Sequence, residues 1–128
     1  METKHSVLII DDDKFLLDMY ALKFSQMGWR VDTALGSIDG LAKLREGLKP
    51  DVLLTDVLMP SMDGFELLEH IRDKKLAEGA KIIILSNKGE KQDIDRGIAL
   101  GADVYIVKAS AIPSEVVAQA TKILEDKK

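Results

Sequence analysis

Three consecutive aspartates, Asp11 to Asp13, directly follow an apolar run in this 128-residue sequence. Asp56 closes a second apolar run, and Ser86 and Lys108 close two more. Carboxylates that lie close together repel one another and take up protons unless a cation neutralises them. Mg²⁺ is typically bound by a few carboxylates together with waters and substrate phosphates. These residue types therefore predict a divalent-cation site, for Mg²⁺ or Mn²⁺, at which phosphoryl groups react.

Phosphoryl transfer to a carboxylate is the chemistry that this set favours. A carboxylate can attack phosphorus to give an aspartyl phosphate, and the reaction needs mainly positioning and charge neutralisation. We expect Asp11, Asp12 and Asp56 to bind the cation. Lys108 can supply a second positive charge, and the Ser86 hydroxyl can donate a hydrogen bond to a phosphoryl oxygen.

Strand and helix patterns alternate along the whole chain and would position these residues. Strands are predicted from short apolar or alternating runs at 6–10, 29–34, 51–55, 81–85 and 104–107. Helices are predicted from apolar residues at helical spacing over 14–27, 37–46, 63–75, 90–100 and from Pro113 onward. Strict alternation of this kind predicts one α/β domain, residues 1–128, with a parallel sheet covered by five helices on its two faces.

The least apolar strand, 29–34, is expected at an edge of the sheet. With right-handed crossovers this gives the doubly wound, flavodoxin-like order 2-1-3-4-5. Ligands bind in such sheets beyond the carboxyl ends of the strands, at the switch point between strands 1 and 3. The four strands expected around that point each end in one of the polar residues above, whereas strand 29–34 does not.

Composition narrows the classes of protein further. The sequence has no cysteine and only two histidines, which excludes thiolate metal sites and argues against a histidine-built one. The net charge of −4, with basic residues scattered among acids, argues against direct binding of nucleic acid by this chain. No apolar run approaches the roughly 20 residues of a membrane span, and no signal peptide is recognisable. We therefore expect a cytoplasmic protein with no membrane contact.

Two further acids have simpler predicted roles at helix ends. Asp13 is expected to favour the start of the first helix through the helix dipole rather than to bind metal. Asp63, which precedes Gly64, is expected to be the N-cap of the third helix.

The motifs LIIDD, LLTDVLMPSMDGFELL, IIILS and GADVYIVK, in this order and spacing, resemble the response-regulator receiver domain of bacterial two-component systems. The resemblance covers about residues 6 to 125. It implies a phosphorelay signalling domain rather than an enzyme acting on a separate substrate. Asp56 matches the aspartate that accepts the phosphoryl group from a histidine kinase or phosphotransfer protein. Asp11 and Asp12 match the acidic metal-binding pair, and the backbone carbonyl of Leu58 matches the third protein ligand.

The resemblance also implies a switch. Ser86 matches the switch hydroxyl, Lys108 the phosphoryl-binding lysine, and Tyr105 the aromatic residue that turns inward on activation. Phosphorylation would then remodel the face made by the fourth helix, fifth strand and fifth helix, for a protein partner or a homodimer. Asn87 stands where a small residue is usual, and Ala109 stands where proline is usual. Before a non-proline residue a trans peptide bond is the default, so we expect Lys108–Ala109 to be trans.

The lifetime of the phosphoryl group would depend on two neighbouring side chains, Leu58 and Lys88. In the resembled family, polar groups at these positions help to place the hydrolytic water. Leu58 has no hydrogen-bonding group, and charged Lys88 cannot accept a proton from water. We therefore expect a long-lived phosphorylated state. The 128 residues end without an effector domain, so the chain is either a stand-alone receiver or part of a longer protein.

Two alternatives are weighed against this interpretation. The haloacid dehalogenase-like phosphatases also use an aspartate nucleophile, and Asp11 and Asp13 fit their D-x-D motif. These enzymes, however, need an acidic pair later in the chain, at the end of another strand, and this sequence does not offer one. The phosphatase interpretation also gives Asp56 no role. A degenerate receiver that serves only for docking is the second alternative, but all residues of the acceptor site are present.

Overall fold

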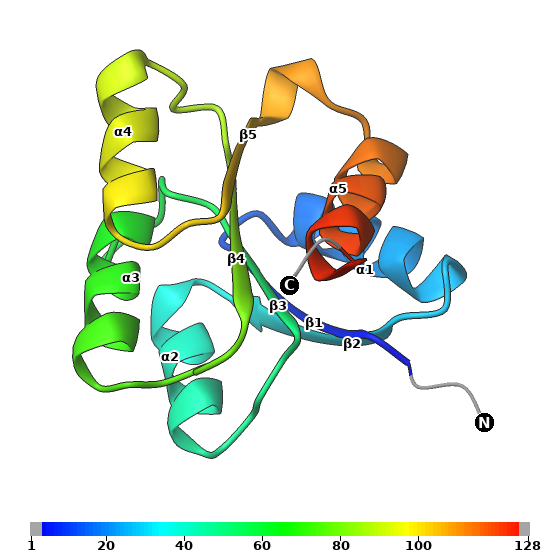
Figure 1. The fold of residues 1–128 in the computed structure, drawn as a ribbon, viewed down its shortest axis with the longest axis horizontal. Helices are drawn as coiled ribbons and strands as arrows, with labels where there is room; N and C mark the ends of the chain where they lie inside the picture. Colours follow the sequence, from blue (N-terminus) through cyan, green and yellow to red (C-terminus); the bar gives the residue numbers. More distant parts are fainter. Residues whose placement is uncertain (1–3, 126–128) are drawn as a thin grey trace.

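The computed structural model describes residues 4–125, in which strands and helices alternate (Figure 1). The strands are β1 (Ser6–Asp11), β2 (Arg30–Leu35), β3 (Val52–Thr55), β4 (Lys81–Ser86) and β5 (Val104–Val107). The helices are α1 (Lys14–Gln26), α2 (Ser37–Arg45), α3 (Gly64–Asp73), α4 (Lys91–Ala99) and α5 (Pro113–Glu125). A 3-10 helix, η1 (Lys108–Ser110), follows β5 and was not predicted.

All strands pair in parallel in the order β2-β1-β3-β4-β5, which confirms the predicted flavodoxin-like topology. The half-exposed strand β2 lies at one edge, as its composition indicates, and β5 lies at the other. The central strands β1 and β3 are buried along their whole length. Their continuous apolar composition follows from this burial on both faces.

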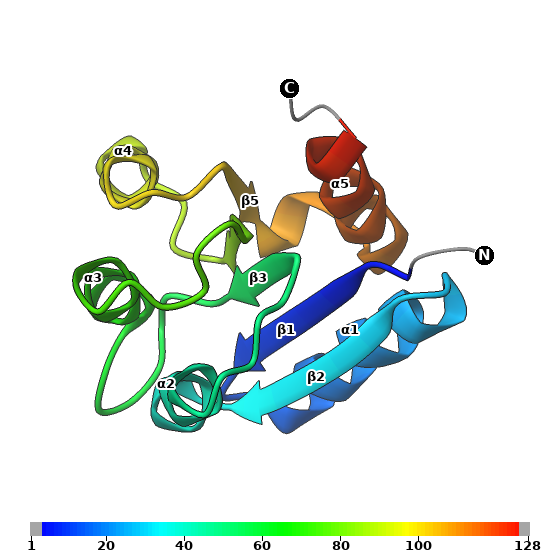
Figure 2. The same cartoon turned by 60° about the horizontal axis from the view of Figure 1, so that its bottom comes forward.

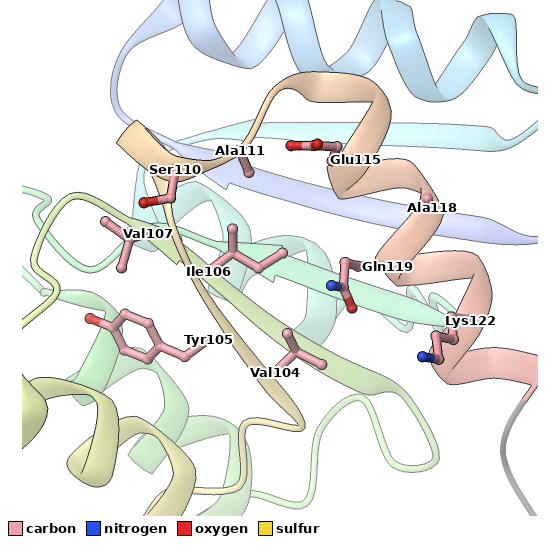
Figure 3. A pocket seen from close by; sticks show the side chains of 10 residues that line it. All are labelled: Val104, Tyr105, Ile106, Val107, Ser110, Ala111, Glu115, Ala118, Gln119 and Lys122. Carbon is pink, nitrogen blue, oxygen red and sulfur yellow. The ribbon is translucent and has the colours of Figure 1, made fainter.

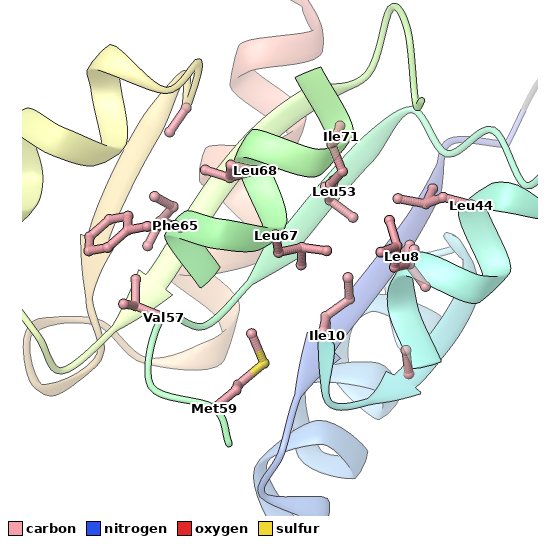
Figure 4. Packing of buried hydrophobic residues seen from close by; sticks show 14 residues of the cluster. Leu8, Ile10, Leu44, Leu53, Val57, Met59, Phe65, Leu67, Leu68 and Ile71 are labelled. Atoms are coloured by element: carbon pink, nitrogen blue, oxygen red, sulfur yellow. The ribbon is translucent and has the colours of Figure 1, made fainter. Parts of the chain in front are cut away.

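Helices cover both faces of the sheet (Figures 1 and 2). Side chains alternate along each strand, so Val7 and Ile9 face α1 and α5, whereas Leu8 and Ile10 face α2 and α3. Figure 4 shows this second layer, in which Phe65 of α3 packs over the sheet. Two apolar layers therefore hold the strand ends in fixed positions.

Two details differ from the sequence-based expectations. Trp29 was predicted to begin the second strand, but it precedes β2 and packs edge-on against Phe24, with 5.0 Å between ring centroids. Ile38 shares the helical spacing of Leu41 and Leu44, yet it is exposed while they are buried. The buried face of α2 is formed by Ser37, Gly40, Leu41 and Leu44, and Ile38 lies to the side of this face, toward solvent.

Aspartates cap the two helices that follow β1 and β3. The cap at Asp63 was predicted, whereas Asp13 was expected to act only through the helix dipole. Asp13 is the N-cap of α1, and its carboxylate accepts a hydrogen bond from the backbone N–H of Leu16. Asp63 is the N-cap of α3 and forms a reciprocal capping box with Glu66. Among residues 4–125 no helix is both long and apolar enough to cross a membrane.

Candidate functional site

The strand register brings Asp11 and Asp56 together at the carboxyl edge of the sheet. Ile10 of β1 lies beside Thr55 of β3, and the Asp56 N–H donates to the Ile10 carbonyl at 3.1 Å. Asp11 and Asp56, which follow Ile10 and Thr55, therefore lie side by side at the end of the two strands. Both carboxylates are buried, and this point is the switch point at which such sheets bind ligands.

Three carboxylates converge there, as the sequence predicts. Oxygen atoms of Asp11, Asp12 and Asp56 lie within 4.8 Å of one another. Asp12 is exposed, while Asp11 and Asp56 are 3% and 7% exposed. Burial raises the pKa of Asp11 above its ordinary value, because the charged form loses its hydration. A set of hard oxygen donors with one member facing solvent fits Mg²⁺, which keeps several of its own waters.

Lys108 links the two buried carboxylates directly. Its Nζ donates hydrogen bonds of 2.9 Å to Asp11 Oδ2 and 2.9 Å to Asp56 Oδ2. Burial alone would lower the pKa of Lys108, but the hydrogen bonds and charges of the two aspartates outweigh it and raise the pKa. The ammonium group is therefore fully charged at neutral pH and lies at the centre of the site.

Backbone groups hold the second oxygen of Asp56. Its Oδ1 accepts hydrogen bonds from the N–H groups of Val57, at 2.6 Å, and Leu58, at 3.4 Å. The Leu58 side chain is 56% exposed beside the site. Gly64 lies so close that a Cβ added to it would be 2.2 Å from the Asp56 carbonyl oxygen. We predicted only a helix start at Gly64, and no local sequence pattern indicates its close approach to Asp56.

Ser86 and Tyr105 flank the loop between β4 and α4. Ser86 ends β4, is fully buried, and its Oγ accepts a hydrogen bond from the Lys88 N–H at 3.2 Å. The Tyr105 hydroxyl donates to the Lys88 carbonyl, so its ring faces this loop. The structure thus connects these two predicted switch residues through Lys88. The Lys108–Ala109 peptide bond is trans, as predicted.

A doubly wound sheet with this acidic cluster and a mostly buried lysine side chain defines a receiver-type signalling fold. The chain belongs to the response regulator receiver domain family, which it matches over residues 7–120. Members of this family are signalling domains that bind Mg²⁺ in an acidic pocket and interact with histidine kinases or phosphotransfer proteins. The match confirms the resemblance seen in the sequence and lends no support to the phosphatase alternative.

Individual relatives agree with this assignment. The transcriptional regulatory protein AfsQ1 of Streptomyces coelicolor is 38% identical over 103 residues, which cover 80% of this chain and 44% of AfsQ1. The chemotaxis protein CheY of Treponema pallidum is 34% identical, covering 81% of this chain and 72% of CheY. The crystal structure of CheY4 from Vibrio cholerae superposes with a TM-score of 0.86 at 26% identity, covering 94% and 99% of the two chains. The chain spans about half the length of the curated transcriptional regulators that it matches.

Proposed function

We propose that Asp56 is the residue that accepts the phosphoryl group in this phosphorelay receiver. The observation that carries the proposal is the paired contact of Lys108 with Asp56 and Asp11 at the switch point of the sheet. Asp56 is the only one of the three clustered acids that contacts both the lysine and two backbone N–H groups among the described residues. These donors can hold one carboxylate oxygen while the other reacts.

The proposed reaction is a transfer between two side chains. A carboxylate oxygen of Asp56 attacks the phosphorus of a phosphohistidine, the P–N bond breaks, and the imidazole nitrogen leaves with the electron pair. Lys108 neutralises charge on the phosphoryl oxygens, and Ser86 donates a hydrogen bond to one of them. Because the chain positions these groups itself, we propose that it promotes its own phosphorylation and dephosphorylation.

We propose that Asp11, Asp12, Asp56 and the Leu58 carbonyl bind Mg²⁺, with Mn²⁺ as a substitute. The bound cation would supply charge neutralisation for the phosphoryl oxygens. Asp12→Ala should weaken Mg²⁺ binding more than Asp13→Ala, since the Asp13 carboxylate faces the start of α1. Isothermal titration of both variants measures the difference. Equal losses would contradict the ligand assignment.

Exposed apolar side chains around the site favour a protein as the phosphoryl donor. Phe15, Leu58 and Ile112 are each more than half exposed, and they lie in the three loops or helix starts next to Asp12, Asp56 and Lys108. Apolar groups exposed together typically mark a protein contact. We propose that a histidine kinase or phosphotransfer protein docks here and presents its phosphohistidine to Asp56.

The output is proposed to be a phosphorylation-dependent contact of the face formed by α4, β5 and α5, with another protein or a second copy. A cleft of about 600 Å³ lies along this face between β5 and α5 (Figure 3). It is lined by the four residues of β5, including Tyr105, and by polar residues of α5 such as Glu115 and Lys122. The ring of Tyr105 points away from α5, toward the β4–α4 loop (Figure 3), so an outward turn of this ring would alter the β5 wall of the cleft. Amide chemical shifts of residues 87–112 should change on phosphorylation.

The acceptor assignment is tested with Asp56→Asn and a small phosphodonor such as phosphoramidate, in the presence of Mg²⁺. We expect acid-labile phosphate on the wild-type chain and none on Asp56→Asn. Asp95→Asn removes an exposed carboxylate from α4 and serves as the matched control, which should label like the wild type. Undiminished labelling of Asp56→Asn at another residue would refute the proposal.

A further inference from the structure

Lys88 joins three elements around Tyr105. Its N–H donates to Ser86 Oγ at the end of β4, its carbonyl accepts from the Tyr105 hydroxyl on β5, and its Nζ lies 3.3 Å from Asp93 Oδ1 on α4. A single loop residue therefore contacts both predicted switch residues and the helix of the output face. The backbone contacts are available to any residue at this position, whereas the ion pair needs a cationic side chain.

The ion pair has one fixed and mostly buried partner. The Asp93 side chain is 9% exposed, and its Oδ2 accepts a hydrogen bond from the Glu90 N–H at 3.2 Å within the capping box of α4. The Lys88 side chain is 41% exposed and has to reach this carboxylate. An ion pair whose carboxylate is already held in place costs less side-chain entropy than a pair of two mobile, exposed groups. Lys91–Asp95, on the same helix, is such an exposed pair.

Two glycines allow α4 and the preceding loop to lie close to β5. A Cβ at Gly97 would be 3.0 Å from Tyr105 Cδ2 and 3.1 Å from Cε2, so the ring packs directly on the helix backbone. A Cβ at Gly89 would be 2.7 Å from Val107 Cγ2. Burial, with smaller contributions from the charges of Asp93 and Asp56, raises the pKa of Tyr105 to about 12. The hydroxyl therefore keeps its proton and remains a donor.

We propose that the Lys88–Asp93 ion pair positions the β4–α4 loop so that the Lys88 carbonyl can bind the Tyr105 hydroxyl. Tyr105 can then occupy its inward site in the unphosphorylated chain. The inward site is the space between residues 87–90 and Gly97. The inference rests on the proposed switch role of Tyr105 and adds Lys88 and Asp93 as positioning residues. Phosphorylation then increases an existing inward population rather than creating it, and the ion pair sets the starting level.

The variants separate the ion pair from the hydrogen bonds. Lys88→Met removes the charge but keeps the backbone carbonyl that accepts from Tyr105. Asp93→Asn removes the opposite charge and retains an oxygen that can accept from Glu90 in the capping box. Lys88→Arg keeps the cation and should behave like the wild type. Lys91→Met is the matched control, because it breaks the exposed pair on the same helix.

The position of Tyr105 can be followed by fluorine NMR of chains labelled with 3-fluorotyrosine, without any phosphodonor. The sequence has two tyrosines, so the resonance that disappears in Tyr105→Phe identifies the relevant one. The urea-unfolded wild-type chain, in which the tyrosine rings are exposed to water, supplies a reference for the displaced ring. Lys88→Met and Asp93→Asn should both move the resonance toward this reference. The ratio of inward to displaced ring should fall about two- to fivefold, the range expected for one partly exposed ion pair.

The double variant Lys88→Met/Asp93→Asn should shift the resonance no further than either single change, because both remove the same interaction. An unmoved resonance in the single variants, additive shifts in the double variant, or an equal shift in Lys91→Met would each overturn the inference. Circular dichroism at the same temperature shows whether each variant is folded. The measurement uses no phosphodonor, so it is independent of the labelling of Asp56. An unmoved resonance would overturn the role of the ion pair even if Asp56 is phosphorylated, and a loss of labelling would overturn the acceptor assignment even if the resonance moves.

Discussion

Replacing Lys108 by methionine tests the electrostatic account of the site most directly. The substitution keeps most of the length of the side chain but removes the cation that contacts Asp11 and Asp56 at 2.9 Å each. At an effective dielectric constant of about 20, each contact corresponds to a gross attraction of about 6 kcal/mol. Desolvation of the charges offsets much of this, and breaking a buried ion pair typically costs about 3–5 kcal/mol. One aspartate can also protonate, and the raised pKa of Asp11 makes this easier.

We therefore expect Lys108→Met to lower the free energy of unfolding by about 3 kcal/mol at pH 7. Urea unfolding in EDTA measures the loss, and repeating it with Mg²⁺ should narrow the difference from the wild type, because the cation replaces the lysine charge. Lys91→Met is the control, since both partners of its ion pair are exposed, and it should be nearly neutral. Adding Asp11→Asn to Lys108→Met should restore part of the stability. A loss no larger than that of Lys91→Met, or one unaffected by Mg²⁺, would refute the reasoning.

Two further predictions concern neighbours of Asp56. Leu58→Asn, with or without Lys88→Glu, should speed phosphate release several-fold without preventing labelling. Leu58 is exposed beside the site but cannot hydrogen-bond a water, and the Lys88 ammonium is held by Asp93. The rates of phosphate release from the wild type and the variants are compared at one Mg²⁺ concentration. Equal rates would show that the Leu58 side chain does not control hydrolysis. Gly64→Ala should cost about 1–3 kcal/mol and reduce labelling, since its Cβ would displace the backbone that carries Asp56. Normal labelling with normal urea unfolding would show that the loop adapts.

The position of the site could be predicted because it depends on strand ends. Each strand is defined by its apolar run, and parallel strands present their carboxyl ends at one edge of the sheet. Asp11, Asp56, Ser86 and Lys108 follow four such runs directly, so a correct strand order was enough to bring these residues to the same edge. The weak apolar character of residues 29–34 supplied that order. The pairing of the strands therefore accounts for the part of the site that could be predicted, which is the placement of these four residues at one edge of the sheet.

The contacts of Lys88 and Gly64 could not be predicted in this way. They depend on the path of loops and on side-chain rotamers, which are set by packing between elements rather than by a local pattern. The sequence places Lys88 beside the phosphoryl site but does not indicate its contacts with Tyr105 and Asp93. The η1 turn, which begins at Lys108, could not be predicted either, because its short sequence carries no periodic signal.

The arrangement around Asp56 explains how one site could serve both before and after phosphoryl transfer. Lys108 has three N–H donors, of which two contact the carboxylates, and the Val57 and Leu58 amides hold the far oxygen of Asp56. A phosphoryl group on the Oδ2 side would meet a cation already in place, while Oδ1 keeps its backbone donors. Donors that are fixed before the reaction need no reorganisation as charge develops. The cation that relieves repulsion between Asp11 and Asp56 in the resting site is thus the same group that would stabilise the phosphoryl oxygens, so a substitution of Lys108 should affect stability and phosphorylation together.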